Sequence, residues 1–399
     1  MTTVRHLEDG DRERVAYLQR QAFLLPPERI SIAGQYPAEQ GWVVEDGGVV
    51  HGALRVQKLG QFFGGRPVPC AAVSSVKVAA ESRGAGYGGA LLREVLLALR
   101  GEGVAVSTLF PVHLGVYRRY GWETAFACQR LRLPLEEAVI RGHRGAYRIE
   151  PWGDGDLDEV ADFYRSVVAG QNGPFERTGE WWTERVLAPR YGREPYRYVA
   201  RSEQGIGGYL LYTQEPAGAN LPYGFELDCR DFFWAAPAAA RAMLDFIRGH
   251  AGMGHAFSWI GPVTDPLEGL LSGLGPSLEK RLVSMCRLVD VGAALEARGY
   301  PAGLATSIRL SVRDDVLEDN HGTYEIEIAE GRADVAGPDL SAGEAPDAEV
   351  DVGTLATLFT GWLDPSAAVA TGRLKAGPEA IESLRAAFGG PAPWMAEFF

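Results

Sequence analysis

An arginine followed by interleaved glycines forms the stretch of the chain most able to do chemistry. Arg83 opens the pattern Arg83-x-x-Gly86-x-Gly88, with Gly84 inside it. Glycine permits φ > 0 and leaves backbone N–H groups uncovered, so such a turn before a helix offers donors to phosphate oxygens. A guanidinium adds charge-assisted hydrogen bonds to the same phosphates. A phosphate site and a structural glycine turn beside a surface arginine both fit this pattern.

A strand and a helix are needed to position this turn. Residues 72–78 are apolar and rich in valine, which predicts a strand. From Leu92 to Leu99, apolar residues recur at i, i+3, i+4 and i+7, which predicts a buried helix. No Gly-Lys-Ser/Thr follows the turn, so it is not a P-loop. The dinucleotide spacing G-x-G-x-x-G is not in its usual place either.

This strand–turn–helix unit resembles the acetyl-CoA loop of the GNAT N-acetyltransferases, and a second segment agrees with it. Residues 103–123 predict a strand, a short helix and the ending Tyr117-x-x-Tyr120-Gly121-Trp122. That ending is similar to the family's Y-x-x-F/Y-G-F/W element beside the thioester. The resemblance implies acetyl-CoA as co-substrate and a fold of the order β-α-β-β-β-α-β-α-β.

The resemblance also implies roles for individual residues. The turn from Arg83 to Gly88 would hold the pyrophosphate, and main-chain groups of Val76 and Val78 would orient the pantetheine arm and the carbonyl. Tyr117 stands in the family's general-acid position. A phenol pKa of about 10 is close enough to a thiol pKa of about 8.5 for efficient proton transfer. The alternative is that Tyr117 is only a packing aromatic.

The opening of the chain recurs further along. Gly-Asp-x-x-x-Val-Ala stands at residues 10–16 and again at residues 155–161, each after a predicted strand. This repeat predicts a second GNAT-like domain over residues 146–290, related to the first by internal duplication. Its strand–helix junction departs from the pattern, because Pro237 opens the helix and no glycines precede it. We therefore expect no coenzyme there and one active site per chain.

The last hundred residues predict a different module. The run from 351 to 388 gives a helix, a glycine stop, a second helix, a Gly-Arg-Leu-Lys strand and a final helix. This order resembles the sterol-carrier-protein fold. The predicted fold class is α/β with mixed sheets: tandem GNAT folds over residues 1–145 and 146–290, then a sterol-carrier-protein-like domain over 291–399. That architecture resembles the Eis (enhanced intracellular survival) family of N-acetyltransferases.

The apolar tail gives a prediction for the catalytic base. A free chain end is usually frayed and polar, but Pro-Ala-Pro-Trp-Met-Ala-Glu-Phe-Phe invites burial. In the Eis family a C-terminal carboxylate acts as the base, and a Glu-Phe ending is shared here as Glu397-Phe398, or Phe399 is itself the match. We predict that the carboxylate of Phe399 is the base, acting directly, through water, or by positioning the ammonium. An apolar tail that only seals a domain contact is the alternative.

An acceptor pocket is less clearly marked. Glu28, Glu39 and Trp42 offer two carboxylates and an aromatic face to a cationic substrate. They fit a solvated loop and a core tryptophan equally well. A net charge of −13 argues against a nucleic-acid partner and mildly favours a cationic one.

Composition limits the remaining classes. The 399 residues allow two or three domains, and no apolar run of ~18 residues predicts a membrane span. The charged start of the chain has no signal-peptide core, so we expect a cytoplasmic protein. Its four cysteines are far apart and fit reduced, buried thiols, with Cys70 alone close enough to the proposed site to need a test as a nucleophile. Histidine spacing predicts no metal.

These observations lead to one main hypothesis and two alternatives. The main hypothesis is transfer of acetyl from acetyl-CoA to a primary amine, of aminoglycoside, polyamine or lysine type, directly in a ternary complex. The alternatives are a tandem-GNAT aminoacyl transferase and a non-catalytic lipid- or acyl-CoA-binding protein that uses the C-terminal module. Family resemblance further implies a homo-oligomer, with a hexamer as the expected size.

Overall fold

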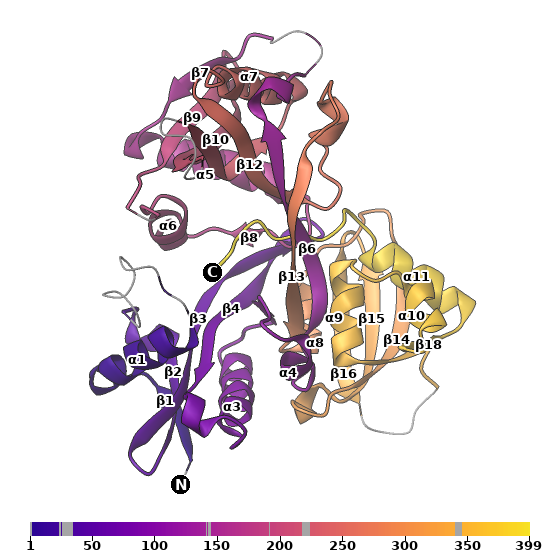
Figure 1. Ribbon diagram of the computed structural model, residues 1–399. Coiled ribbons are helices and arrows are strands. Elements are labelled where there is room, and N and C mark those ends of the chain that lie inside the picture. Colours follow the sequence, from indigo (N-terminus) through magenta and orange to yellow (C-terminus); the bar gives the residue numbers. More distant parts are fainter. Residues whose placement is uncertain are drawn as a thin grey trace. The chain divides into compact units, whose positions relative to one another are not determined.

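The computed structural model describes residues 2–23, 25, 35–140, 142, 145–190, 192–217, 224–339 and 345–399 (Figure 1). They form two compact units. The first unit takes in residues 1–125, residues 284–391 and Phe399, and the second takes in residues 126–283 and 392–398. No helix within the described ranges is long and apolar enough to cross a membrane.

The N-terminal part of the first unit is a mixed sheet with helices on both faces, as expected for a GNAT fold. Its elements are β1 (Thr3–His6), α1 (Arg12–Ala22), β2 (Gly41–Asp46), β3 (Val49–Phe63), β4 (Arg66–Val78), α3 (Tyr87–Gly101), β5 (Val106–Leu109) and α4 (Leu114–Arg118). Strands β1 to β4 pair antiparallel in sequence order, and β5 joins β4 in parallel. The predicted order of strands and helices up to this point is confirmed.

Residue alternation divides the core of this sheet between its two faces. Trp42 and Val44 of β2 pack with the buried stripe of α3, which includes Leu92 and Leu96. Val43, between them, packs on the opposite face with buried residues of α1. A strand directs successive side chains to opposite faces, so one strand supplies both cores.

In each unit, the strand that closes the sheet differs from the one that we expected. We expected the strand near residues 125–133 to close the first GNAT sheet. In the structure, this strand, β6 (Glu123–Pro134), pairs with β12 (Gly254–Pro262) in the second unit, and β13 (Ser277–Leu288) pairs with β5 in the first. The two repeats offer similar closing strands, and local pattern does not reveal which sheet each strand joins.

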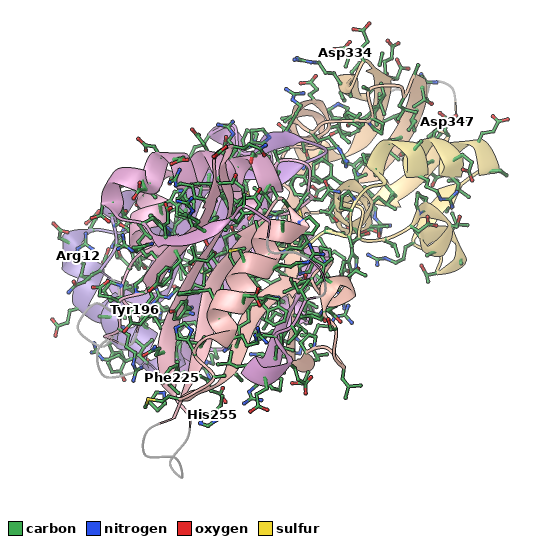
Figure 2. All side chains as sticks on the ribbon, turned by 90° about the horizontal axis from the view of Figure 1, so that it is seen from above. Arg12, Tyr196, Phe225, His255, Asp334 and Asp347 are labelled. Carbon is green, nitrogen blue, oxygen red and sulfur yellow. The ribbon has the colours of Figure 1, made fainter. Side chains whose placement is uncertain are left out.

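The second unit repeats the GNAT arrangement. Its elements are β6, β7 (Arg148–Pro151), α5 (Leu157–Val168), β8 (Phe175–Glu176), α6 (Gly179–Trp181), β9 (Tyr196–Ser202), β10 (Gly205–Pro216), β11 (Phe225–Trp234), α7 (Pro237–Arg248) and β12. The sheet order is β6-β12-β11-β10-β9-β7, with β11 and β12 parallel. Figure 2 shows Phe225 and His255 close together where these two strands begin.

The C-terminal part of the first unit is a mixed five-stranded sheet with helices. Its order is β16-β15-β14-β17-β18, and Figure 1 shows α9, α10 and α11 gathered beside it. The elements are α8 (Val291–Ala297), β14 (Thr306–Arg313), β15 (Gly322–Ala329), β16 (Arg332–Asp339), β17 (Ala348–Asp351), α9 (Val352–Thr360), α10 (Pro365–Ala370), β18 (Leu374–Ala376) and α11 (Pro378–Phe388). Gly361 ends α9 in the left-handed region at φ 81°, as the predicted glycine stop requires.

Candidate active site

A bulge in β4 shapes the centre of the first GNAT sheet. Ala53 pairs with Lys77 and Arg55 pairs with Ser74, so Ser75 and Val76 together face a single residue of β3. Ser75 has φ 52°, which is a strained conformation for a residue with a side chain. An extra residue of this kind bends the strand and ends regular pairing nearby.

The bulge leaves one edge of β4 open beyond it. Strand β5 pairs with β4 only over Cys70–Ala72. The Ala79 N–H donates to the His51 carbonyl at 2.8 Å, so Ala79 faces β3. Because alternate residues direct their N–H and C=O groups to opposite edges, Val76 and Val78 face the edge that β5 no longer covers. Within the described residues, no strand pairs with that edge at these two positions, which are the ones predicted from the sequence.

The glycine turn lies between this open strand and helix α3. Gly84 and Gly86 adopt φ 85° and 89°, and Gly86 is the residue just before the helix. Among the described residues, the N–H groups of Gly86, Tyr87 and Gly88 have no acceptor. The first N–H groups of a helix lack intrahelical partners and carry positive partial charge, so this end attracts anions.

Arg83 stands exposed at the start of that turn. It forms no ion pair with any residue that the structure describes. Further along, Gly89 leaves room for Tyr120, because a Cβ there would come within 2.2 Å of the Tyr120 hydroxyl. Tyr120 thus packs against the first turn of α3.

Tyr117 lies on α4, and its ring packs in the hydrophobic core that also contains the buried side chains of α3. The residue is 6% exposed, and its ring meets Trp122 edge-on at 6.3 Å between centroids. Burial raises the pKa of the Tyr117 phenol. The phenol therefore stays protonated at neutral pH and is able to donate a proton, as a general acid must.

Lys77 is a potential functional residue that the sequence analysis missed. It is 3% exposed, and its ammonium donates to the Ser75 carbonyl at 3.1 Å. Burial lowers the pKa of Lys77 to about 7. A lysine in this valine-rich strand was visible in the sequence, but the absence of a carboxylate partner among the described residues was not.

The tail is buried in the second unit. Trp394 donates its backbone N–H to the Asn172 carbonyl at 3.0 Å and its indole N–H to Gln171 at 2.6 Å. Glu397 lies 3.0 Å from Arg177 and 2.8 Å from the Tyr164 hydroxyl. The expectation that the apolar tail is buried is confirmed for these residues.

The last two residues of the tail differ from the residues before them in burial or in the unit to which they belong. Phe398 is exposed, whereas Phe399 belongs to the first unit and its ring lies 5.6 Å from that of Phe110. Phe110 follows β5 directly and precedes the helix that carries Tyr117.

The structure describes two of the three residues predicted to bind the acceptor amine, and they differ in burial. Trp42 is 8% exposed and its ring lies 4.0 Å from that of His6, so it is a core residue of the sheet. Glu39 is exposed on a short turn before β2. Glu28 lies outside the described residues.

The cysteines are buried free thiols, as predicted. Burial raises the pKa of Cys70 well above its ordinary value, so the thiolate needed for nucleophilic attack is disfavoured. Within the described residues, no group of three or more His, Cys, Asp or Glu is placed to hold a metal ion.

Comparison with known protein families follows the same division of the chain. Models of an acetyltransferase (GNAT) domain match residues 3–125 and residues 173–288. A model of a sterol carrier protein domain matches residues 291–396.

Relatives match most of the chain, and solved structures match all of it. An uncharacterized N-acetyltransferase of Streptomyces avermitilis is 26% identical over 353 residues, covering 84% of this chain and 83% of its own. N-acetyltransferase Eis of Mycobacterium tuberculosis is 25% identical over 350 residues, covering 83% and 81%. A GCN5-related N-acetyltransferase from Anabaena variabilis superimposes over the full length of both chains with 26% identity and a TM-score of 0.92. Eis1 from Mycobacterium abscessus, at 22% identity and a TM-score of 0.79, shares the fold.

The open strand edge, the glycine turn and these matches define the class of protein. The chain is a GNAT-family N-acetyltransferase, and its GNAT domains imply acetyl-CoA as the co-substrate. Within that class, two GNAT domains followed by a sterol carrier protein domain place it in the Eis type.

Proposed function

We propose that this enzyme transfers the acetyl group of acetyl-CoA to a primary amine by direct attack in a ternary complex. The amine nitrogen bonds to the thioester carbonyl carbon, and the carbon–sulfur bond breaks. The departing thiolate takes one proton, and the amine loses one. The acceptor classes we propose are aminoglycoside-like amines, polyamines and lysine-type amines.

The observation that carries this proposal is the bulge in β4 together with the turn that follows it. The backbone groups of Val76 and Val78 bind the pantetheine arm and polarise the thioester carbonyl. The uncovered N–H groups at the start of α3 bind the pyrophosphate, with Gly84, Gly86 and Gly88 allowing close approach and Arg83 adding charge. Donors fixed in advance near a developing oxyanion stabilise the transition state.

Tyr117 and the carboxylate of Phe399 handle the protons in this scheme. The raised pKa of Tyr117 keeps its proton available for the thiolate. The Phe399 carboxylate accepts the amine's proton directly or through water. Its support is the buried tail up to Glu397 and the contact of Phe399 with Phe110. For the acceptor, Glu28 and Glu39 are the proposed partners of its positive charge, and burial gives Trp42 a smaller part.

The test is release of coenzyme A from acetyl-CoA with a panel of aminoglycosides, polyamines and lysine peptides. We expect turnover with at least one amine, and a fall in kcat on the order of 100-fold in Tyr117→Phe, since general acids contribute that much or more. Tyr120→Phe is the matched control and should keep most of the activity. Acetyl-CoA affinity should be the same in all three proteins.

Two further measurements separate the alternatives. Removal of residues 397–399, and separately addition of one glycine after Phe399, should abolish turnover while acetyl-CoA still binds. Turnover that survives both changes excludes the carboxylate as base. Binding of lipid vesicles without acetyl-CoA binding would instead support the lipid-carrier alternative, and turnover only with an aminoacyl donor would support the aminoacyl transferase.

A further inference from the structure

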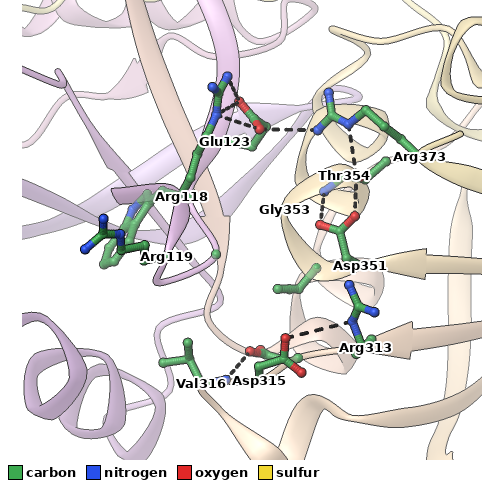
Figure 3. Close-up of a pocket in the computed structure, with 14 residues that line it drawn as sticks. Arg118, Arg119, Glu123, Arg313, Asp315, Val316, Asp351, Gly353, Thr354 and Arg373 are labelled. Atoms are coloured by element: carbon green, nitrogen blue, oxygen red, sulfur yellow. Dashed lines mark hydrogen bonds and ion pairs between the residues drawn. The ribbon is translucent and has the colours of Figure 1, made fainter. Parts of the chain in front are cut away.

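A polar cavity of about 300 Å³ lies in the first unit, away from the glycine turn. It is bordered by the end of α4, the end of β14, the start of α9 and the residue before β18 (Figure 3). None of residues 83–88 lines it, so it is not the proposed pyrophosphate site. Its volume reaches the lower limit of small-molecule binding sites.

The carboxylates of this cavity are already hydrogen-bonded. Figure 3 shows Arg118 and Arg373 both reaching Glu123, at 2.8 Å and 3.4 Å. Asp351 caps α9 by accepting from the Thr354 N–H at 2.9 Å and from its hydroxyl at 2.6 Å.

Both carboxylate oxygens of Asp314 also accept hydrogen bonds. It is fully buried beside Arg287, whose Nη2 donates to it at 2.5 Å. The N–H groups of Val316 and Leu317 donate to its other oxygen at 3.0 and 3.1 Å. Asp315 is the remaining acid of the lining, and it is mostly exposed.

In contrast to the carboxylates, the side chains of two of the arginines that line the cavity form no hydrogen bond with the described residues. Arg119 has no acceptor within the part of the chain that the structure describes, and Arg313 has only Asp315 at 3.9 Å. Five guanidinium N–H groups on each of these arginines are thus open to an acceptor. Four arginines and four acids line the cavity, so the formal charges of the lining cancel and the excess lies in hydrogen-bond donors rather than in charge.

Residues that line the cavity also carry further N–H groups without acceptors. Trp122 lines the cavity, is almost fully buried, and its indole N–H has no acceptor among the described residues. The N–H groups of Val352 and Gly353, at the start of the nine-residue helix α9, also have none there. A helix start adds positive partial charge to such groups.

We propose that this cavity is a binding site for a small organic oxyanion, carrying a phosphate or carboxylate group. Arg119 and Arg313 bind its oxygens, and the first N–H groups of α9 complete the site. Arginines beside a helix start are the usual donor set for such anions. The ligand is a second one, bound apart from the coenzyme and contacted by both the GNAT domain and the sterol carrier domain.

The experiment is isothermal titration calorimetry with inorganic phosphate, pyrophosphate and citrate, at low ionic strength. Coenzyme A is present at saturation throughout, so that the glycine turn is occupied. The test protein is Arg119→Gln/Arg313→Gln. The matched control is Arg148→Gln/Arg332→Gln, which removes the same charge from two exposed arginines outside the cavity.

We expect the unaltered protein and the control to bind at least one of the three anions equally well, and the test protein to bind it at least tenfold more weakly. A loss of one or two charge-assisted hydrogen bonds has about that effect. Pyrophosphate or phosphate binding without citrate binding identifies a phosphorylated ligand, and the reverse identifies a carboxylate. No binding of any anion to the unaltered protein, or equal weakening in test and control proteins, overturns the proposal.

Discussion

Lys77 and Asp231 stand at equivalent places in the two GNAT sheets. Each is the first paired residue after a bulge, since β11 also carries one: Leu211 pairs with Asp231 and Tyr212 with Cys229, leaving Arg230 unpaired. Both side chains are buried, at 3% and 5% exposure. Among the described residues, Lys77 has a backbone carbonyl as its hydrogen-bond partner and no carboxylate, whereas Asp231 forms a two-bond ion pair with Arg177.

The difference continues along each strand. Beyond Lys77 the chain passes through the turn of residues 79–86 before α3 begins, whereas only residues 235 and 236 separate β11 from α7. The bulge is thus a feature of both sheets, whereas the turn to which we assign coenzyme binding is present only in the first.

In the second sheet, the residue that follows the bulge in β11 is linked to the C-terminal tail of the chain. Arg177 lies between Asp231 and Glu397, with its guanidinium 4.0 Å from the centre of the Tyr164 ring. The next inward-facing aromatic of β11, Phe233, lies 6.3 Å from Trp394 of the tail. The second domain therefore holds the chain's own tail at β11, the strand that corresponds to β4, where we propose that the coenzyme binds.

The largest effect should come from removing the cation of this cluster. Arg177→Met leaves the Asp231 and Glu397 carboxylates buried without their partner, and breaking such a pair costs about 3–5 kcal/mol. We expect the free energy of unfolding of the second unit to fall by that amount in urea titrations followed by tryptophan fluorescence.

The control for this change is Arg165→Met, which removes an ion pair with Glu176 at the surface. It should cost no more than about 1 kcal/mol. Equal losses in the two variants would mean that the tail is held by its apolar residues alone, and that Arg177 contributes little.

A smaller effect is expected at the turn that only the first domain has. Gly86→Val places a β-branched residue at φ 89°, which valine strongly disfavours. The turn should rearrange, and acetyl-CoA affinity measured by calorimetry should fall on the order of 100-fold, since the bound phosphates lose several charge-assisted hydrogen bonds.

Ala236→Val, at the corresponding helix start of the second domain, is the matched control, because φ −131° there suits any residue. It should leave acetyl-CoA affinity unchanged. Weaker coenzyme binding in this control would show that the second domain takes part in binding, contrary to the proposal of one site per chain.

This comparison also shows what the sequence could reveal. The strand, glycine turn and helix around Gly86 were predicted because valine content, glycine spacing and helical periodicity are local signals. The Arg177–Glu397 pair joins residues 220 positions apart and leaves no local signal. The exchange of β6 and β13 was missed for the same reason, since either strand fits either sheet. Burial of Lys77 depends on packing from both sides, which no spacing rule reports.

The smallest effect should appear in the pH dependence of stability. The pKa of Lys77 is about 7 in the folded chain, against 10.5 for an ordinary lysine. Below pH 7 both folded and unfolded chains hold the proton, and the folded state bears the full cost of a buried charge. Between pH 7 and 10.5 the unfolded chain binds more protons, so stability rises with pH.

Lys77→Met removes this dependence, whereas Lys58→Met, at an exposed position of β3, should keep it. In urea titrations at pH 7.5 and 9.5, the unaltered protein should gain about 2 kcal/mol relative to Lys77→Met. Parallel pH profiles would mean that Lys77 finds a charged partner or water in solution, and the contrast with the paired Asp231 would be lost.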